Sequence, residues 1–121
     1  MDDAVKSKIE TLINEHEVVL FMKGTSNMPQ CGFSSRVAGI LNYLQINFKD
    51  VNVLEDDEIR QGIKDFSDWP TIPQLYVKNV FIGGADIITE MTMSGELDQL
   101  FTEKSVSFSQ EAAAKIREEN S

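Results

Sequence analysis

The single cysteine of the chain, Cys31, stands where its thiol would be reactive. It follows a loop containing Pro29 and Gln30, and an apolar stripe with helical spacing begins two residues later, at Phe33. The free amides and the dipole at the start of a helix stabilise a thiolate and lower the pKa of the thiol. A buried, inert cysteine would instead have apolar neighbours on a strand or in the middle of a helix. The pattern therefore favours an exposed, reactive thiol.

The counts of cysteine and histidine exclude several kinds of chemistry. One cysteine cannot form an internal disulfide, which fits a reducing compartment. Cys31 and the only histidine, His16, cannot make a four-ligand zinc site within one chain. Ser34 stands where a dithiol redox motif would carry its second cysteine, so the chain alone cannot cycle between dithiol and disulfide. His16 lies between Glu15 and Glu17, and we expect it to be a solvated surface side chain.

Charge is unevenly distributed along the chain. The formal net charge is −9, which disfavours binding to nucleic acids and to anionic membranes. Residues 18–49 contain no acid but include Lys23, Arg36 and Lys49, whereas residues 50–68 contain seven acids. Local positive charge around a thiol lowers its pKa and attracts anionic ligands. The alternative is that a buried strand and helix are acid-poor by chance.

The length and the N-terminus bound the class of protein. The 121 residues suffice for one domain with its own core. We expect this domain to span 1–104 and a polar tail, helical or partly disordered, to span 105–121. No apolar run is long enough to span a membrane, and the N-terminus lacks the basic start and apolar segment of a secretory signal. We therefore predict a bacterial cytoplasmic protein, with an organelle matrix as the alternative for a processed form.

The spacing of apolar residues predicts alternating helices and strands. Helices are expected at 3–15, after Cys31, after a cap at Asp56 or Asp57, from Asp86 to a break at Gly95, and briefly at 97–101; strands are expected at 18–22, 47–53, 75–77 and 80–82. The early strand, helix and strand predict a parallel crossover, and the last two strands predict an antiparallel hairpin. The expected result is one mixed sheet with helices on both faces.

Two loops could border a binding site. Residues 69–74 carry Pro70 and Pro73, which we interpret as loop stiffening, with Trp69 as a packing anchor. Any X–Pro bond has only about a 5% chance of being cis. The segment 83–86, Gly-Gly-Ala-Asp, joins a strand to a helix, where glycines allow a close approach and free amides bind carboxylates. The alternative for this segment is a tight turn without a ligand.

Four motifs in order resemble a known family. Met22-Lys-Gly24, Pro29-Gln-Cys-Gly-Phe-Ser34, Trp69-Pro-Thr-Ile-Pro-Gln74 and Gly83-Gly-Ala-Asp86 are similar to those of monothiol glutaredoxins of the CGFS class, over roughly residues 3–104. The resemblance implies an α/β, thioredoxin-like fold with a central mixed four-stranded sheet flanked by helices. It also implies a glutathione-ligated [2Fe–2S] cluster that bridges two subunits.

The resemblance assigns roles on one side of the expected site. Cys31 resembles the family's cluster ligand and redox thiol. Lys23 resembles the lysine that contacts the glycine carboxylate of glutathione and supports the thiolate. Arg60 resembles the helix residue that pairs with the same end of glutathione, with Lys64 as its neighbour.

The other side of the expected site is assigned in the same way. Ile72, before a cis Pro73, resembles the residue whose backbone pairs with the cysteinyl part of glutathione. Ala85 and Asp86 resemble the pair that holds the γ-glutamyl end through a backbone amide and a carboxylate. Many family members carry Cys or Ser where this chain has Ala85; the backbone role survives that change, and extra thiol chemistry does not.

Ligand stoichiometry permits the cluster. A [2Fe–2S] core needs four ligands, most often thiolates. Two copies of Cys31 supply two, and two more must come from a small thiol; an acid-free, lysine-bearing region suits a dianionic tripeptide such as glutathione.

The leading hypothesis is therefore a cluster carrier, a homodimer when loaded, that serves apo iron–sulfur proteins. One alternative is an enzyme, a glutathione-dependent oxidoreductase acting on protein–glutathione mixed disulfides. Another is an iron-sensing partner of a BolA-family protein.

Overall fold

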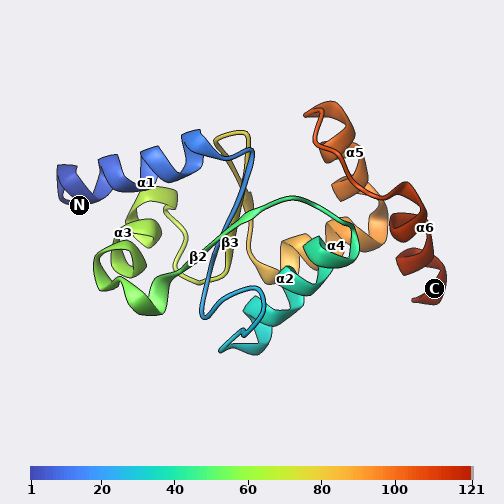
Figure 1. The fold of residues 1–121 in the computed structure, drawn as a ribbon, viewed down its shortest axis with the longest axis horizontal. Coiled ribbons are helices and arrows are strands. Elements are labelled where there is room, and N and C mark those ends of the chain that lie inside the picture. The colour runs from blue at the N-terminus through green and yellow to red at the C-terminus, as the bar shows by residue number, and fades with distance from the viewer. Residues whose placement is uncertain (121) are drawn as a thin grey trace.

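Four strands form one mixed sheet with helices on both faces in the computed structural model, which describes residues 1–120 (Figure 1). This confirms the predicted architecture. In chain order the elements are α1 (Asp3–Glu15), β1 (Val18–Met22), α2 (Gly32–Tyr43), β2 (Lys49–Asn52), the short 3₁₀ helix η1 (Val53–Glu55), α3 (Asp57–Ser67), β3 (Gln74–Val77), β4 (Val80–Gly83), α4 (Ala85–Ser94), α5 (Glu96–Glu103) and α6 (Gln110–Glu119).

The strand order is β2-β1-β3-β4, so β1 and β3 are central. β1 runs parallel to β2 through the crossover of α2, and antiparallel to β3. β3 and β4 form the predicted antiparallel hairpin. Its turn residues Lys78 and Asn79 both adopt positive φ, 49° and 71°, the conformation that matches the twist of a two-residue hairpin even though neither is glycine.

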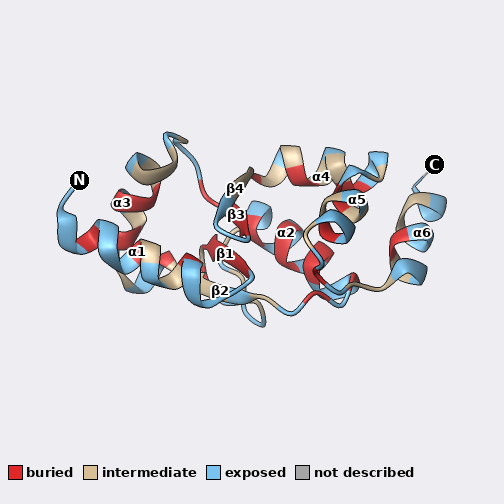
Figure 2. Cartoon of the chain, turned by 90° about the horizontal axis from the view of Figure 1, so that it is seen from above, coloured by how far each residue is buried: buried red, intermediate tan, exposed pale blue. Residues whose placement is uncertain are grey.

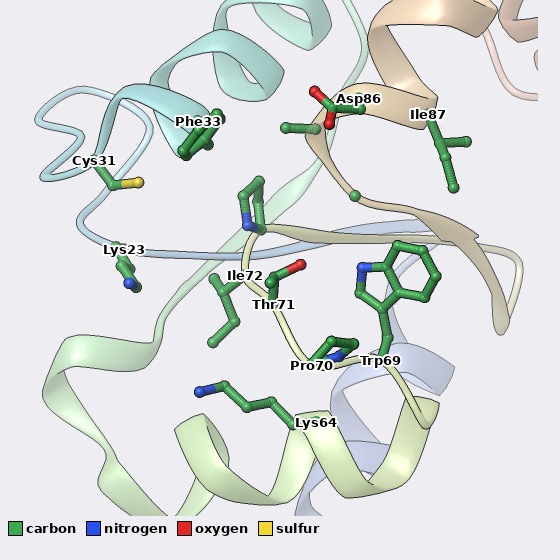
Figure 3. Close-up of a pocket in the computed structure, with 13 residues that line it drawn as sticks. Lys23, Cys31, Phe33, Lys64, Trp69, Pro70, Thr71, Ile72, Asp86 and Ile87 are labelled. Atoms are coloured by element: carbon green, nitrogen blue, oxygen red, sulfur yellow. The ribbon is translucent and has the colours of Figure 1, made fainter.

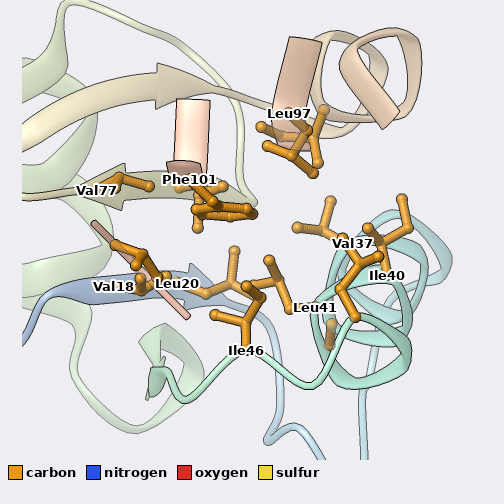
Figure 4. Close-up of a cluster of buried hydrophobic side chains, with 14 of the residues drawn as sticks. Val18, Leu20, Val37, Ile40, Leu41, Ile46, Val77, Leu97 and Phe101 are labelled. Carbon is orange, nitrogen blue, oxygen red and sulfur yellow. The ribbon is translucent and has the colours of Figure 1, made fainter. Parts of the chain in front are cut away.

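The continuous apolar run of β1 is explained by burial on both faces. Successive side chains of a strand point to opposite faces. Val18, Leu20 and Met22 therefore join a core with α2, α4, α5 and α6, whereas Val19 and Phe21 join a second core with α1 and α3 (Figures 2 and 4). The sheet thus has one core on each side, and both are anchored on β1.

Short polar side chains begin three of the helices. The carboxylates of Asp2 and Asp56 accept hydrogen bonds from the amides of Ala4 and Ile59, at 2.7 and 3.1 Å, and the hydroxyl of Ser109 caps α6 in the same way. Of the two acids proposed to cap the third helix, the structure selects Asp56, which also pairs with Lys8 of α1. The strand predicted at 47–53 is shorter, because Asn52 accepts from the amide of Leu54 and turns the chain into η1.

The segment after α5 returns to the core before it forms α6. Val106 and Ala113 are buried, and the ring of Phe108 lies 6.1 Å from that of Phe101. The amide of Ser109 donates to the carbonyl of Leu44, 2.8 Å away. The division at residue 104 stays a prediction, and Ser121 of the expected tail lies outside the described residues. Within 1–120, none of the helices combines the length and the hydropathy that a bilayer crossing needs.

Close packing of α1 on α3 gives a test of this arrangement. A Cβ at Gly62, in α3, would lie 2.5 Å from Cγ1 of the buried Val5, whereas a Cβ at the exposed Gly39, in α2, would meet nothing within 4 Å. We expect Gly62→Ala to lower the free energy of unfolding by about 1–3 kcal/mol through overpacking, an effect larger than the gain in helix propensity. Gly39→Ala should raise it by about 0.5–1 kcal/mol. Urea denaturation measures both, and equal shifts in the same direction would contradict the packing.

Candidate functional site

A cavity of about 480 Å³ opens at one end of the sheet, next to the only cysteine (Figure 3). It lies between the start of α2, the face of α3, the loop before β3 and the start of α4. The residues that line it are Lys23, Cys31, Phe33, Lys64, Trp69, Pro70, Thr71, Ile72, Pro73, Gly84, Ala85, Asp86 and Ile87. The cavity therefore brings together every site residue predicted from the sequence except Arg60; their individual roles stay predictions.

Cys31 occupies the N-cap position of α2 and is partly exposed. Its pKa is lowered, chiefly because the amide of Ser34 faces the sulfur, with smaller contributions from the amide of Phe33, the hydroxyl of Ser34 and the charge of Lys23. Partial burial acts in the opposite direction and does not outweigh these groups. The helix start thus favours the thiolate, the reactive form of cysteine.

Ser34 connects the thiol to the strand that precedes it. The residue is fully buried, and its Oγ accepts a hydrogen bond from the amide of Lys23 at 3.0 Å. The same hydroxyl faces the sulfur of Cys31 and helps to lower the pKa of the thiol. A single buried side chain therefore sets the relative positions of the thiol and the lysine.

The loop between Lys23 and Cys31 is fastened to β2. The side chain of Asn52 accepts from the amide of Gly24 at 2.9 Å, and the carboxylate of Asp50 accepts from the amide of Ser26 at 2.7 Å. Asn52 also accepts from the amide of Leu54, so one side chain holds two segments. In the sequence, Asp50 is only one member of an acidic segment. Its hydrogen bond to Ser26 depends on the pairing of β2 with β1, which the sequence does not show directly.

Glycine is required at the first turn of this loop. Gly24 has φ of 90°, and a Cβ there would lie 2.5 Å from the carbonyl oxygen of Met28 and 2.6 Å from the amide nitrogen of Gln30. Both contacts are to backbone, so neither neighbour can rotate away. Gly24 thereby allows the loop to close back on itself before Cys31.

The loop that precedes β3 is held by a buried amide. The Nε2 of Gln74 donates to the carbonyls of Trp69 and Thr71, both at 3.1 Å, and its Oε1 accepts from the hydroxyl of Tyr76 at 3.4 Å. Gln74 is fully buried, and burial raises the pKa of Tyr76 to about 12, so the phenol stays protonated. The Ile72–Pro73 bond within this loop is cis, as the family resemblance implies.

Trp69 packs against the sheet, as predicted, and it also lines the cavity, which the sequence did not indicate. Its ring lies 5.8 Å from that of Phe81. On its other side, a Cβ at Gly84 would lie 3.2 Å from its Nε1 and 3.3 Å from the carbonyl oxygen of Pro73. The glycine before α4 therefore lets the start of this helix approach the loop closely.

Asp86 and the lysines lie across the cavity from one another (Figure 3). Asp86 is in the first turn of α4, and its side chain is 93% exposed. Lys64, from α3, lines the opposite side with Lys23. Arg60 lies one turn earlier on α3 and is not part of the lining, and its buried Nε has no hydrogen-bond partner among the described residues. Its predicted pairing with glutathione stays a prediction.

Phe33 corrects one sequence interpretation. Helical spacing predicts that it belongs to the apolar stripe of its helix, but the residue is 55% exposed and lines the cavity, whereas Val37, Ile40 and Leu41 are buried. In the first turn of α2, Ser34 points inward and is buried, whereas Phe33 lies on the side of the helix that faces the cavity. Sequence reasoning also missed Thr71 and Ile87 as lining residues, because nothing in their types signals a site.

The described part of the chain offers no complete metal site by itself. Within residues 1–120, no group of three or more His, Cys, Asp or Glu side chains is placed to hold a metal ion. The donor set at the cavity is one thiol, which is a soft ligand suited to an iron–sulfur cluster. These residues therefore fit a cluster only if the other ligands come from outside the chain.

Comparison with known proteins places this geometry in a family. The glutaredoxin family model matches residues 18–82. The chain is 52% identical over 100 residues to the ycf64-like monothiol glutaredoxin of Synechocystis sp., covering 83% of this chain and 94% of that protein. It is 47% identical to monothiol glutaredoxin-4 of Schizosaccharomyces pombe over 83% of this chain, but spans only 41% of that longer protein.

The fold comparison agrees. A monomeric truncated mutant of Trypanosoma brucei 1-C-Grx1, solved in solution, superimposes with a TM-score of 0.79 at 37% identity, covering 85% of this chain and 94% of that one. The expected α/β, thioredoxin-like fold, with its mixed four-stranded sheet flanked by helices, is thereby confirmed.

The lowered pKa of Cys31 can be measured directly. We expect the rate of alkylation by iodoacetamide to rise with a midpoint below that of an ordinary cysteine, because the amide of Ser34 stabilises the thiolate. Ser34→Ala should raise the midpoint, and Lys23→Met should raise it by less, since the hydroxyl contributes more than the distant charge. Lys64→Met serves as the charge-matched control and should leave the midpoint in place. A wild-type midpoint at the ordinary value would contradict the site's electrostatics.

Proposed function

The chain belongs to the glutaredoxin family and is of the monothiol type, and on that premise we propose that it binds a glutathione-ligated [2Fe–2S] cluster and transfers it to apo-proteins in cluster assembly and iron homeostasis. The observation that carries the proposal is the thiolate-favouring Cys31 at the mouth of a cavity with no second protein thiol. A lone ligand of this kind can take part in a four-ligand cluster only by sharing it with other molecules.

The charges in the cavity support glutathione as the small thiol. Lys23 and Lys64 lie on one side, and Asp86 lies on the other. Glutathione carries a glycine carboxylate at one end and an ammonium group at the γ-glutamyl end, so each end meets an opposite charge. In this arrangement the thiol in the middle of the tripeptide lies near Cys31 and near Ile72, in the loop before β3.

Apolar exposure beside the thiol supports sharing of the cluster between two chains. Met28 and Phe33, which flank Cys31 in sequence, are 68% and 55% exposed. Exposed apolar side chains next to a partly exposed ligand favour contact with another protein. We propose that this partner is a second copy of the chain in the loaded form, an apo iron–sulfur protein during transfer, and in the iron-sensing alternative a BolA-family protein.

The compartment we propose is the bacterial cytoplasm. A free thiolate persists where glutathione and thioredoxin keep thiols reduced. The 52% identical relative comes from a cyanobacterium, which supports a bacterial origin. An organelle matrix is the alternative for a processed form.

Anaerobic reconstitution tests the carrier. With iron, sulfide and glutathione, we expect the wild type to acquire visible absorbance and to elute as a dimer. Cys31→Ser should remain a colourless monomer, because the only protein ligand is lost. Ser35→Ala, an exposed change on the same turn of α2, is the matched control and should behave as the wild type. A colourless wild type in every condition, or colour without glutathione, would refute the proposal.

A single reactive thiol also favours a second candidate, glutathione-dependent reduction of mixed disulfides. Its motivation is the lowered pKa and partial exposure of Cys31. We expect the apo-protein to reduce a glutathionylated peptide only slowly in a glutathione-coupled assay. Rapid, Cys31-dependent turnover by the apo-protein would make the enzyme the better description.

A further inference from the structure

Arg36 lies beside Asp86, which lines the cavity. Its Nη1 lies 3.9 Å from Oδ1 of that carboxylate, across the gap between α2 and α4. Neither the family resemblance nor the lining of the cavity gives Arg36 a role. Asp86 lines the side of the cavity away from Lys23 and Lys64, so Arg36 places a cation next to the anion on that side.

The guanidinium is held in this place by an aromatic ring. Its Cζ lies 5.8 Å from the centroid of Phe33, a distance typical of a cation–π contact. Phe33 and Arg36 are three residues apart on α2, so they share one face of the helix. Since Phe33 lines the cavity, the contact places the guanidinium of Arg36 next to a lining side chain.

The pair is available to a ligand. A separation of 3.9 Å is too long for a direct hydrogen bond, and the two side chains are 48% and 93% exposed. An exposed pair of this kind contributes little to stability. The donors of Arg36 and the acceptors of Asp86 therefore keep most of their hydrogen-bonding capacity.

We propose that Arg36 binds the α-carboxylate of a γ-glutamyl head, next to Asp86, which the family resemblance already assigns to that end of the ligand and which would take the ammonium. The inference rests on the proposed function, in which the γ-glutamyl end of glutathione lies at this side of the cavity. That end carries both charges on one carbon, and two opposite charges side by side match it. Arg36 is then a specificity-determining residue that selects tripeptide thiols with an intact γ-glutamyl head.

The expected effect follows from the chemistry of the two charges. An arginine holds a carboxylate through paired N–H donors, and an exposed charge pair of this kind changes affinity by about three- to fivefold. The free amides at the start of α4 also face the carboxylate, so the loss of Arg36 weakens this selectivity without abolishing binding. The contribution should decrease at high salt because both groups are exposed.

Titration of isotope-labelled apo-protein by NMR, in the presence of a non-thiol reductant, tests the assignment. Three ligands are compared: glutathione, 4-aminobutyryl-Cys-Gly, which lacks the α-carboxylate, and glutaryl-Cys-Gly, which lacks the ammonium. In Arg36→Gln we expect the preference for glutathione over the 4-aminobutyryl analogue to fall about three- to fivefold. The preference over the glutaryl analogue should persist, because Asp86 is intact, and Arg36→Lys should restore part of the first preference.

Lys115→Gln removes the same unit charge from α6 and should leave both preferences unchanged. The assignment would be overturned if the wild type and Arg36→Gln preferred glutathione over the 4-aminobutyryl analogue to the same degree. Tighter binding of glutathione by Arg36→Gln would also overturn it, because Arg36 would then only compete with the ligand for Asp86. A wild type whose cavity resonances do not respond to glutathione would instead refute the proposed function. The two failures are therefore distinguishable.

Discussion

The site depends on how the first turn of α2 meets the end of β1. The first amides of any helix have no partners within that helix. Here the amides of Phe33 and Ser34 face the sulfur of Cys31, while the hydroxyl of Ser34 accepts from the amide of Lys23. Ser34 is fully buried, so this junction is fixed by the packing of α2 on the sheet. The electrostatics of the thiol and the position of the lysine are consequently properties of the fold.

The same principle organises the rest of the cavity. Loops form most of its wall, and such loops would be mobile without anchors. A buried or half-buried polar side chain fastens each loop to a strand: Asn52 holds the segment before Cys31, and Gln74 holds the segment before β3. Each of these side chains makes two or more hydrogen bonds, which offsets its desolvation. The loops before Cys31 and before β3, which carry several residues of the cavity wall, are thus fixed to the sheet by hydrogen bonds.

The sequence predicted most of the fold because its local signals agree with its packing. The apolar run of β1, the acid cap of α3 and the glycine break after α4 each point to one structure. The first turn of α2 misled the prediction, since helical spacing identifies an apolar stripe but not which of its residues the core covers, and Phe33 is exposed. The same limit separates Arg60 from Lys64: one turn of α3 decides which side chain reaches the cavity. Asp50 and Arg36 contact residues that are distant in sequence, Ser26 and Asp86, so the sequence alone did not predict these contacts.

The serine at position 34 has consequences beyond the loss of a second thiol. A hydroxyl is a stronger hydrogen-bond acceptor and donor than a thiol, so Ser34 can serve both the amide of Lys23 and the sulfur of Cys31. A cysteine there could resolve a mixed disulfide but would hold this junction more weakly. With serine, no group of the chain itself can displace what Cys31 binds, because the chain has no other thiol. A mixed disulfide at Cys31 must therefore be resolved by an external thiol, which can attack at this partly exposed residue. A thiolate that the fold stabilises and that an incoming thiol can reach supports the proposed transfer of a bound group to a second protein.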